Sequence, residues 1–214
     1  MDNVIIEIKD LCKSFGEQQV LRNVNISLKK GHIYGIVGRN GSGKTVLFKT
    51  ICGFLPVEKG SLRVRDLQLE NSKKMPENMG IIIETPGFLP AYSGYKNLEF
   101  LYCINHKKNK VKIMHTMEQV GLDPHLKRHV GKYSLGMRQR LGIAQAIMED
   151  PDILILDEPM NGLDNQGVED IRALLLDLKE QGKTILIASH NREDIDILCD
   201  HVWEMDQGVA KQVR

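Results

Sequence analysis

One run of residues combines glycines with a lysine and a threonine. It reads Gly38-Arg39-Asn40-Gly41-Ser42-Gly43-Lys44-Thr45 and fits the pattern G-x-x-x-x-G-K-[ST]. Glycine adopts positive φ and carries no Cβ, so successive backbone N–H groups can converge on phosphate oxygens at the start of a helix. Lys44 supplies a cation for the β- and γ-phosphates of a nucleotide, and Thr45 offers a hydroxyl to Mg²⁺. The run therefore predicts a nucleotide phosphate site that works with Mg²⁺.

The residues expected to contact the nucleotide extend one position beyond this run. They are Gly38, Asn40, Gly41, Ser42, Gly43, Lys44, Thr45 and Val46. The run lies between a predicted strand and a predicted helix, which is the context that the pattern requires. An ordinary tight turn is the alternative, and these flanks argue against it.

Two adjacent acids follow a second apolar run. Ile153-Leu154-Ile155-Leu156 precedes Asp157 and Glu158, so both carboxylates lie at the carboxyl end of a predicted strand. In a parallel α/β sheet that end lies beside the phosphate loop. Asp157 is expected to hold the hydration shell of Mg²⁺, and Glu158 to orient or deprotonate the water that attacks the γ-phosphate. The alternative is an acidic helix cap or a solvated turn, which the phosphate loop makes the weaker interpretation.

The hydrophobic pattern predicts the elements that position these residues. Val4–Lys9 and Val24–Leu28 indicate antiparallel strands, and His32–Val37 indicates a strand leading into the glycine loop. A helix is expected from Lys44 to about Cys52. After Pro151 strands and helices alternate again, with strands at 153–156 and 184–188, helices at about 166–181 and 194–199, and two terminal strands.

The middle of the chain changes character. Residues 60–69 alternate and 79–83 form a short strand, but prolines and glycines follow from residue 86, and then helical periodicity. The predicted fold is α/β, with a P-loop NTPase core formed by residues 1–83 and 151–214. The core is expected to hold a mostly parallel sheet and an antiparallel β subdomain. Residues 84–150 are expected to form an inserted helical subdomain within the same nucleotide-binding domain.

Composition excludes several classes of protein. The 214 residues carry 29 Lys and Arg against 28 Asp and Glu, a formal net charge of +1, so we expect no nucleic-acid partner. Apolar runs are only a few residues long, whereas a spanning helix needs about 20. The acidic start has no signal pattern, and the four separated cysteines are interpreted as reduced core thiols. The chain is therefore expected to be cytosolic and to cross no membrane by itself.

A further motif identifies a family. Tyr133-Ser134-Leu135-Gly136-Met137-Arg138-Gln139-Arg140 resembles the signature LSGGQ-x-Q-R of ATP-binding cassette (ABC) transporter subunits, and the resemblance covers essentially the full chain. It implies a dimer, homo- or heteromeric, in which two cassettes enclose two ATP molecules. Ser134 and Gly136 would then contact, in trans, the γ-phosphate held by the partner cassette. The alternative is a plain helix N-cap at Ser134, which is compatible because capping amides also bind anions.

Other positions match the family too. The resemblance implies that Phe15 stacks on adenine, although a core phenylalanine is an equally good interpretation of that residue alone. Asn161–Asp164 matches the segment that crosses the dimer interface. His190 matches the histidine that contacts the γ-phosphate, whereas a histidine at a strand end is usually without function.

The sequence departs from the family pattern at three positions. Leu135 replaces a glycine and Met137 a glutamine in the signature, and Glu84 stands where the family usually has glutamine. A carboxylate at position 84 ligates a hard cation more strongly than an amide, so Glu84 is predicted to act at the metal with Thr45 and Asp157. The ETPGF and SLGMRQRLGIA strings resemble the subgroup that exports bacitracin-type peptides or lantibiotics.

The resulting functional hypothesis is a Mg²⁺-dependent ATPase that powers a separate membrane permease. Lys44, Glu158 and His190 are the expected catalytic residues, and the chain would sit at the cytoplasmic face of the membrane. Aromatic and apolar side chains before the insertion helices are candidate permease contacts: Phe88, Leu89, Tyr92 and Tyr95. Local loop packing explains them equally well. The alternative function is a soluble single-cassette ATPase for macromolecular assembly; a GTPase is disfavoured because the chain lacks an NKxD motif.

Overall fold

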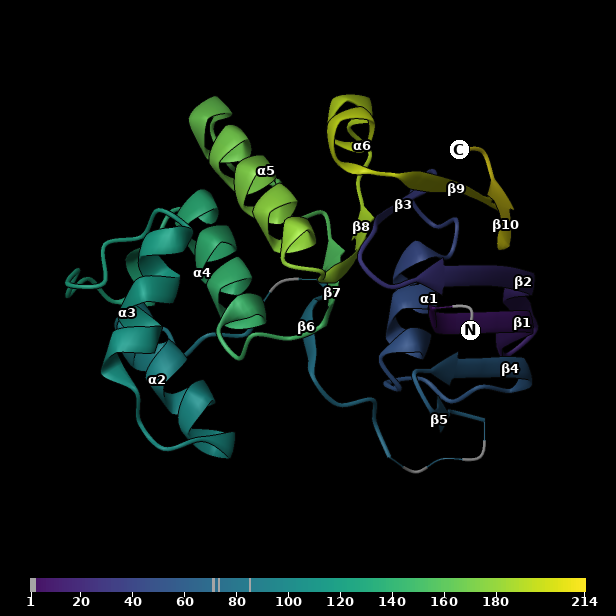
Figure 1. The fold of residues 1–214 in the computed structure, drawn as a ribbon, viewed down its shortest axis with the longest axis horizontal. Helices are drawn as coiled ribbons and strands as arrows, with labels where there is room; N and C mark the ends of the chain where they lie inside the picture. The colour runs from purple at the N-terminus through teal and green to yellow at the C-terminus, as the bar shows by residue number, and fades with distance from the viewer. Residues whose placement is uncertain (1–2, 71, 73, 85) are drawn as a thin grey trace.

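A computed structural model describes residues 3–70, 72, 74–84 and 86–214. Two sheets and six α-helices form the described part of the chain (Figure 1). The strands are β1 (Val4–Phe15), β2 (Gln18–Lys29), β3 (Ile33–Val37), β4 (Lys59–Val64), β5 (Leu67–Gln68), β6 (Met79–Ile82), β7 (Ile153–Asp157), β8 (Thr184–Ala188), β9 (His201–Asp206) and β10 (Val209–Gln212). The helices are α1 (Lys44–Ile51), α2 (Gly94–Asn105), α3 (Lys110–Gln119), α4 (Leu135–Ile147), α5 (Asn165–Glu180) and α6 (Arg192–Leu198), with a 3₁₀ turn η1 at Val130–Lys132.

The six-stranded sheet is mostly parallel, as the sequence predicts. Its order is β10-β9-β3-β8-β7-β6, and only the β10–β9 pair among these neighbours is antiparallel. Every residue of β8 is buried, and β3 and β7 are buried up to their last position. Continuous apolar runs of this kind are typical of strands covered on both faces.

The antiparallel sheet is confirmed, but its two long strands extend further than predicted. The sheet has the order β2-β1-β4-β5, and β1 and β2 each span 12 residues. The apolar alternation stops near Lys9 because the β1–β2 register shifts between Ile8 and Leu11 and again before Lys13 and Ser14. Such β-bulges move side chains between the two faces, so the period of two is lost while pairing continues.

Helices cover both faces of the large sheet. Seen edge-on in Figure 1, α1 lies between this sheet and the antiparallel sheet, and α4 and α5 lie on the opposite side. Two buried clusters correspond to these layers: Ile153 and Ile155 of β7 pack with Phe48 of α1, whereas Leu154 and Leu156 belong to the cluster that includes α4 and α5. Alternating side chains of one strand thus bind the two layers together.

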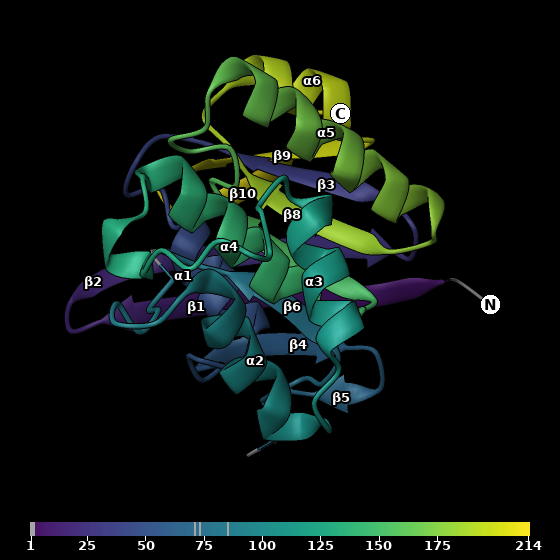
Figure 2. The same ribbon diagram turned by 90° about the vertical axis from the view of Figure 1, so that its left-hand side faces the viewer.

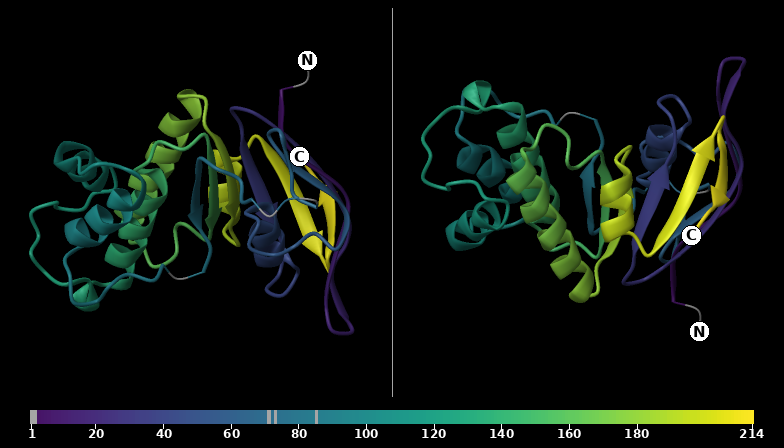
Figure 3. Two further views of the ribbon diagram at one scale, coloured as in Figure 1. Left: turned by 90° about the horizontal axis from the view of Figure 1, so that it is seen from below. Right: turned by 90° about the horizontal axis from the view of Figure 1, so that it is seen from above.

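Helices α2 and α3 form the outermost layer beside α4 (Figures 1 and 2). Views from above and below place these helices at the opposite end of the molecule from the antiparallel sheet (Figure 3). Within the described ranges, no helix combines the length and the apolar character that crossing a bilayer requires.

The interpretation of all four cysteines as core thiols is wrong for one of them. Cys12, Cys52 and Cys199 are buried, and burial raises the thiol pKa of Cys52 and of Cys199 to about 12. Cys103 is exposed because it lies on the face of α2 opposite the buried positions Leu98 and Tyr102.

The close approach of β6 to α4 generates a stability prediction. A methyl group at Gly80 would overlap the Ala146 carbonyl oxygen and lie 2.5 Å from Leu154 Cδ2. Gly80→Ala is therefore expected to reduce the free energy of unfolding by about 1–3 kcal/mol. Urea unfolding of wild type and variant measures this change in the free energy of unfolding. Gly87→Ala, where an added Cβ meets nothing within 4 Å, is the matched control, and equal losses in the two variants would contradict the packing argument.

Candidate functional site

The phosphate loop joins the carboxyl end of β3 to the first turn of α1. Gly38 has φ +149, and a Cβ there would overlap the carbonyl oxygen of Met205, so the position requires glycine. Gly43 precedes α1 in the left-handed region with φ 108, and its helix start has no side-chain cap. Unoccupied N–H groups at a helix start are suited to an anion.

Two observations test whether a phosphate fits this loop. The hydroxyl of Ser42 is buried and has no hydrogen-bond partner among the described residues. Lys44 is 7% exposed, and its ammonium donates to the carbonyl oxygens of Gly38 at 2.7 Å and Arg39 at 3.2 Å. A buried donor without a partner and a cation held inside the loop both match a negatively charged ligand.

The metal residues predicted from two distant segments meet at the start of α1. Thr45 Oγ1 donates to Asp157 Oδ2 at 2.8 Å. Within the described ranges, no three His, Cys, Asp or Glu side chains gather as a protein-only metal site. One hydroxyl and one carboxylate suit Mg²⁺, which keeps several waters and takes further oxygens from substrate phosphates. The donor set therefore fits the ion that the sequence implies.

Glu158 and His190 form a second pair beside the first. Glu158 Oε2 lies 2.9 Å from His190 Nδ1, with the glutamate side chain 25% and the histidine 71% exposed. Glu158 has φ 51, which is costly for a residue with a Cβ, and its N–H donates to Ala188 O at 2.9 Å. Strained backbone of this kind persists only where the surroundings hold it in place.

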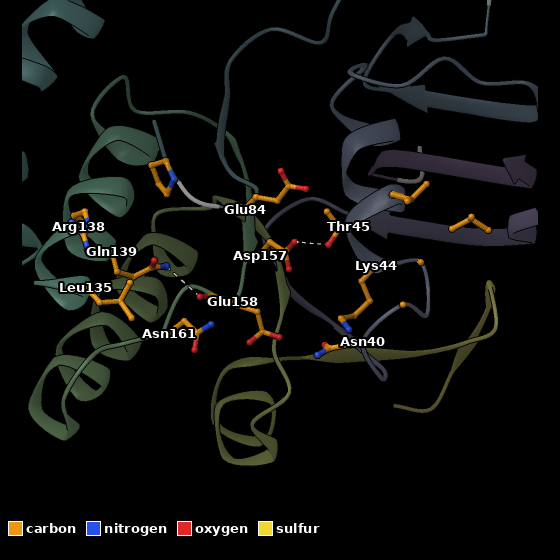
Figure 4. A pocket seen from close by; sticks show the side chains of 15 residues that line it. Asn40, Lys44, Thr45, Glu84, Leu135, Arg138, Gln139, Asp157, Glu158 and Asn161 are labelled. Carbon is orange, nitrogen blue, oxygen red and sulfur yellow. Dashed lines mark hydrogen bonds between the residues drawn. The ribbon is translucent and has the colours of Figure 1, made fainter. Parts of the chain in front are cut away.

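A cleft of about 520 Å³ brings most of the predicted site together. Figure 4 shows Lys44 and Asn40 on one side and Asp157 and Glu158 facing them. The predicted residues that line the cleft are Asn40, Gly41, Gly43, Lys44, Thr45, Val46, Glu84, Asp157 and Glu158. Those outside its lining are Phe15, Gly38, Ser42, Ser134, Gly136 and His190. Sequence reasoning assigned no role in this cleft to Val20, Pro86, Leu135, Arg138, Gln139 or Asn161, which also line it.

The start of α4 packs against the segment that follows the acids. Ser134 caps the helix, because its hydroxyl accepts from Met137 N at 3.1 Å, and its side chain is exposed. Gln139 Nε2 donates to the carbonyl oxygens of Glu158 at 3.2 Å and Pro159 at 3.1 Å. The helix N-cap interpretation of Ser134 is thus observed. The role of Ser134 and Gly136 in trans stays a prediction.

Phe15 lies at the end of β1 and is 48% exposed, so the interpretation of this residue as part of the core is wrong. The ammonium of Lys13 lies 5.5 Å from the centroid of its ring. An exposed ring is compatible with stacking on a base, which stays a prediction.

Glu84 has a partner that the sequence did not indicate. Its Oε1 lies 2.6 Å from Lys49 Nζ on α1, and in Figure 4 its carboxylate points away from Asp157. Lys49 lies one helical turn beyond Thr45, so the carboxylate of Glu84 contacts the second turn of α1. Glu84 also lines the cleft. Lys49 contacts only Oε1 of this carboxylate, and the role of Glu84 at the metal stays a prediction.

Comparison with known proteins assigns the family. A family model described as ABC transporter matches residues 21–161. The chain is 42% identical over 204 residues to the uncharacterized ABC transporter ATP-binding protein YybJ of Bacillus subtilis, covering 95% of this chain and 94% of the relative. It is 41% identical over 206 residues to the bacitracin transport ATP-binding protein BcrA of Enterococcus faecalis, covering 95% and 67%. This chain belongs to the ABC transporter family and is an ATP-binding domain of that family.

The predicted subgroup resemblance is also confirmed. The lantibiotic transport ATP-binding protein SrtF of Streptococcus pyogenes is 35% identical over 204 residues, covering 95% of this chain and 88% of the relative. Among solved structures, a dimeric bacterial ABC transporter cassette has a TM-score of 0.88 at 21% identity, covering 98% and 99%. A nucleotide-free ATP-binding cassette from an ABC transporter has a TM-score of 0.86 at 27% identity, covering 99% and 91%. The predicted cassette fold is confirmed by both.

The Lys49–Glu84 pair generates a prediction about Mg²⁺. Glu84→Gln is expected to raise the Mg²⁺ concentration that half-saturates nucleotide binding roughly fivefold, because an amide binds Mg²⁺ less strongly than a carboxylate by about 1 kcal/mol. Lys49→Gln is expected to act in the opposite direction, since it frees the carboxylate. Fluorescence of a labelled nucleotide measured across a Mg²⁺ series distinguishes them. Identical half-saturation in wild type and Glu84→Gln would show that Glu84 has no role at the metal.

Proposed function

We propose that this chain binds and hydrolyses ATP as the nucleotide-binding subunit of a transporter whose membrane permease is a separate polypeptide. The observation that carries the proposal is the meeting of Thr45 and Asp157 with the Glu158–His190 pair at one edge of the parallel sheet. Residues 1–83 and 151–214 act as the ATP-binding core of a single domain, and residues 84–150 act as its helical subdomain.

In this proposal each group of site residues has a separate role in phosphoryl transfer. The loop amides and Lys44 hold the phosphates, and Thr45 and Asp157 hold Mg²⁺ with its waters. When bound, Mg²⁺ neutralises charge that develops on the phosphate oxygens. Glu158 orients the attacking water and accepts its proton, and His190 contacts the γ-phosphate from the adjacent strand end. Positioning and charge stabilisation are the main sources of catalysis in such reactions.

A second cassette completes the site in this proposal. Ser134 is exposed at the N-terminus of α4 and Gly136 is partly exposed, and both are proposed to contact a nucleotide on another subunit. Asn161 to Asp164 lies directly against α4: a Cβ at Gly136 would stand 2.7 Å from Gly162 O. The dimer interface is therefore expected to include both segments.

The permease is proposed to dock on a groove of about 890 Å³ between β6 and the helices α2 and α4, which is lined by both polar and apolar side chains. Phe54 and Ile104 line it and are 48% and 74% exposed. Leu89 and Tyr92 are also exposed, whereas Phe88 and Tyr95 are partly buried against the core cluster. Of these four residues, only Leu89 and Tyr92 are suited to contact the permease directly. Docking there places the chain at the cytoplasmic face of the membrane.

The names of two relatives suggest which molecules the transporter carries. Proteins named for bacitracin transport and lantibiotic transport are 41% and 35% identical to this chain. We infer that the complete transporter exports antimicrobial or other toxic peptides. The alternative, a soluble cassette that drives macromolecular assembly, lacks a specific observation in its favour.

Removing the proposed general base is the direct test of the chemistry. Glu158→Gln is expected to retain ATP binding, because Lys44, Thr45 and Asp157 are unchanged, and to lower kcat by about 10²–10⁴-fold. Steady-state hydrolysis and equilibrium nucleotide binding measure the two effects. Glu180→Gln, at an exposed position at the end of α5, is the control and is expected to hydrolyse ATP as wild type does. Wild-type turnover in Glu158→Gln would exclude Glu158 as the base.

Recovery of a membrane partner separates transport from assembly. A tagged chain purified from its own cells in mild detergent is expected to bring an integral membrane protein with it. Ile104→Ser is expected to lower that recovery several-fold without changing the unfolding midpoint, because Ile104 is 74% exposed. Val111→Ser, at a site 79% exposed on α3 and outside the groove, is the matched control. Recovery of soluble partners alone would favour the assembly function.

A further inference from the structure

The position of the His190 imidazole depends on the backbone of its loop, because few neighbouring side chains cover the ring. Its side chain is 71% exposed, and it reaches Glu158 Oε2 at 2.9 Å from the loop after β8. An exposed side chain on a loop loses its geometry as soon as the loop moves. What holds residues 189 to 191 therefore decides whether His190 faces Glu158.

Ser189 closes this loop around the histidine. The serine is 4% exposed, and its Oγ accepts from the N–H of Asn191 at 3.1 Å. The same Oγ donates to Asp194 Oδ2 at 3.3 Å. Asn191 in turn caps α6, since its Oδ1 accepts from Glu193 N at 2.9 Å. The residues on both sides of His190 are thus bonded to α6.

A buried ion pair anchors the other end of this chain of contacts. Asp194 is 2% exposed, and its Oδ1 accepts from Arg172 Nε at 2.9 Å and Nη2 at 2.6 Å. Arg172 lies on α5 and is 3% exposed. α5 begins directly after its N-cap Asp164, which is the end of the segment proposed to cross the dimer interface. The contacts therefore run from α5 through Arg172, Asp194 and Ser189 to the loop that carries His190.

Stability alone is a weak reason for such a pair. Replacing a buried ion pair by apolar side chains of similar volume is often neutral or stabilising, so the charged pair is better explained by the geometry that it imposes. Each Asp194 oxygen has a separate role, with Oδ1 bound to α5 and Oδ2 bound to Ser189. A single carboxylate thus sets the distance between α5 and the histidine loop.

We propose that Arg172, Asp194 and Ser189 are positioning residues that hold His190 against Glu158 and tie its placement to α5. The proposal rests on the function proposed above, in which His190 and Glu158 act on the γ-phosphate. Ser189, Asp194 and Arg172 are 4%, 2% and 3% exposed, so each acts through the exposed His190 and not on the nucleotide.

The test is a double-mutant cycle between Ser189→Ala and His190→Ala, measured as steady-state ATP hydrolysis by the full chain. Ser189→Ala is expected to lower kcat about tenfold with the KM for ATP unchanged, because the phosphate and Mg²⁺ contacts remain. In the His190→Ala background, Ser189→Ala is expected to have no further effect, since a positioning residue has nothing left to position. Asp194→Asn provides a second variant with the same expected pattern.

A signal from the histidine itself gives a readout independent of turnover. The imidazole Cε1–Hε1 resonance of His190, assigned by its loss in His190→Ala, is expected to shift and broaden in Ser189→Ala and Asp194→Asn. Glu169→Gln is the matched control, because Glu169 is an exposed partner of Arg172 on α5 and does not contact the loop. Its kcat and its His190 resonance are expected to equal those of wild type.

Two results separate the possible failures. Wild-type kcat and an unchanged His190 resonance in Ser189→Ala, or an equal further loss in the His190→Ala background, would overturn the positioning role alone. Wild-type kcat in His190→Ala would overturn the proposed catalytic role of His190. Arg172, Asp194 and Ser189 would then have no catalytic role to support, even if the His190 resonance shifts in Ser189→Ala.

Discussion

Parallel pairing of β3, β8 and β7 is the constraint on which the site depends. Ile36 is paired with Ala188, and Ala188 with Asp157, so the three strands end together. The phosphate loop, the His190 loop and the two acids leave the sheet at the same edge. A slip of β7 by one residue would turn Asp157 to the other face and break its 2.8 Å hydrogen bond to Thr45. The backbone ladder therefore determines whether Asp157 reaches Thr45, the other residue proposed to hold Mg²⁺.

The same ladder supports the strain at Glu158. Its N–H continues the β7–β8 pairing by donating to Ala188 O, and Gln139 of α4 donates to its carbonyl oxygen. The backbone on both sides of a left-handed residue is thus held by different layers of the molecule. Since α4 carries Ser134 at its start, the segment that holds the acid and the segment proposed to face a second cassette are connected within one chain.

Local patterns predicted the parts of the fold and site that depend on local physics. The apolar runs of β7 and β8 and the strand–loop–helix order at residues 33–51 are encoded by neighbouring residues, and the structure confirms them. The ends of β1 and β2 were missed because bulges break the period of two. Contacts such as Lys49–Glu84 and Arg172–Asp194 join segments 35 and 22 positions apart. No spacing in a single sequence indicates such pairs, because their geometry arises only when the helices pack.

At two positions that depart from the family pattern, 84 and 135, a second residue accommodates the substituted side chain. A carboxylate at position 84 adds negative charge near a triphosphate site, and Lys49 neutralises it at 2.6 Å. Leu135 brings a large side chain to the start of α4, and it fits because Gly162 has no Cβ: one added there would lie 2.5 Å from Leu135 Cγ. Both compensating residues lie outside the phosphate loop and the acid pair. The substitutions at positions 84 and 135 are thus accommodated at the margins of the cleft, while Lys44, Thr45, Asp157 and Glu158 still line it.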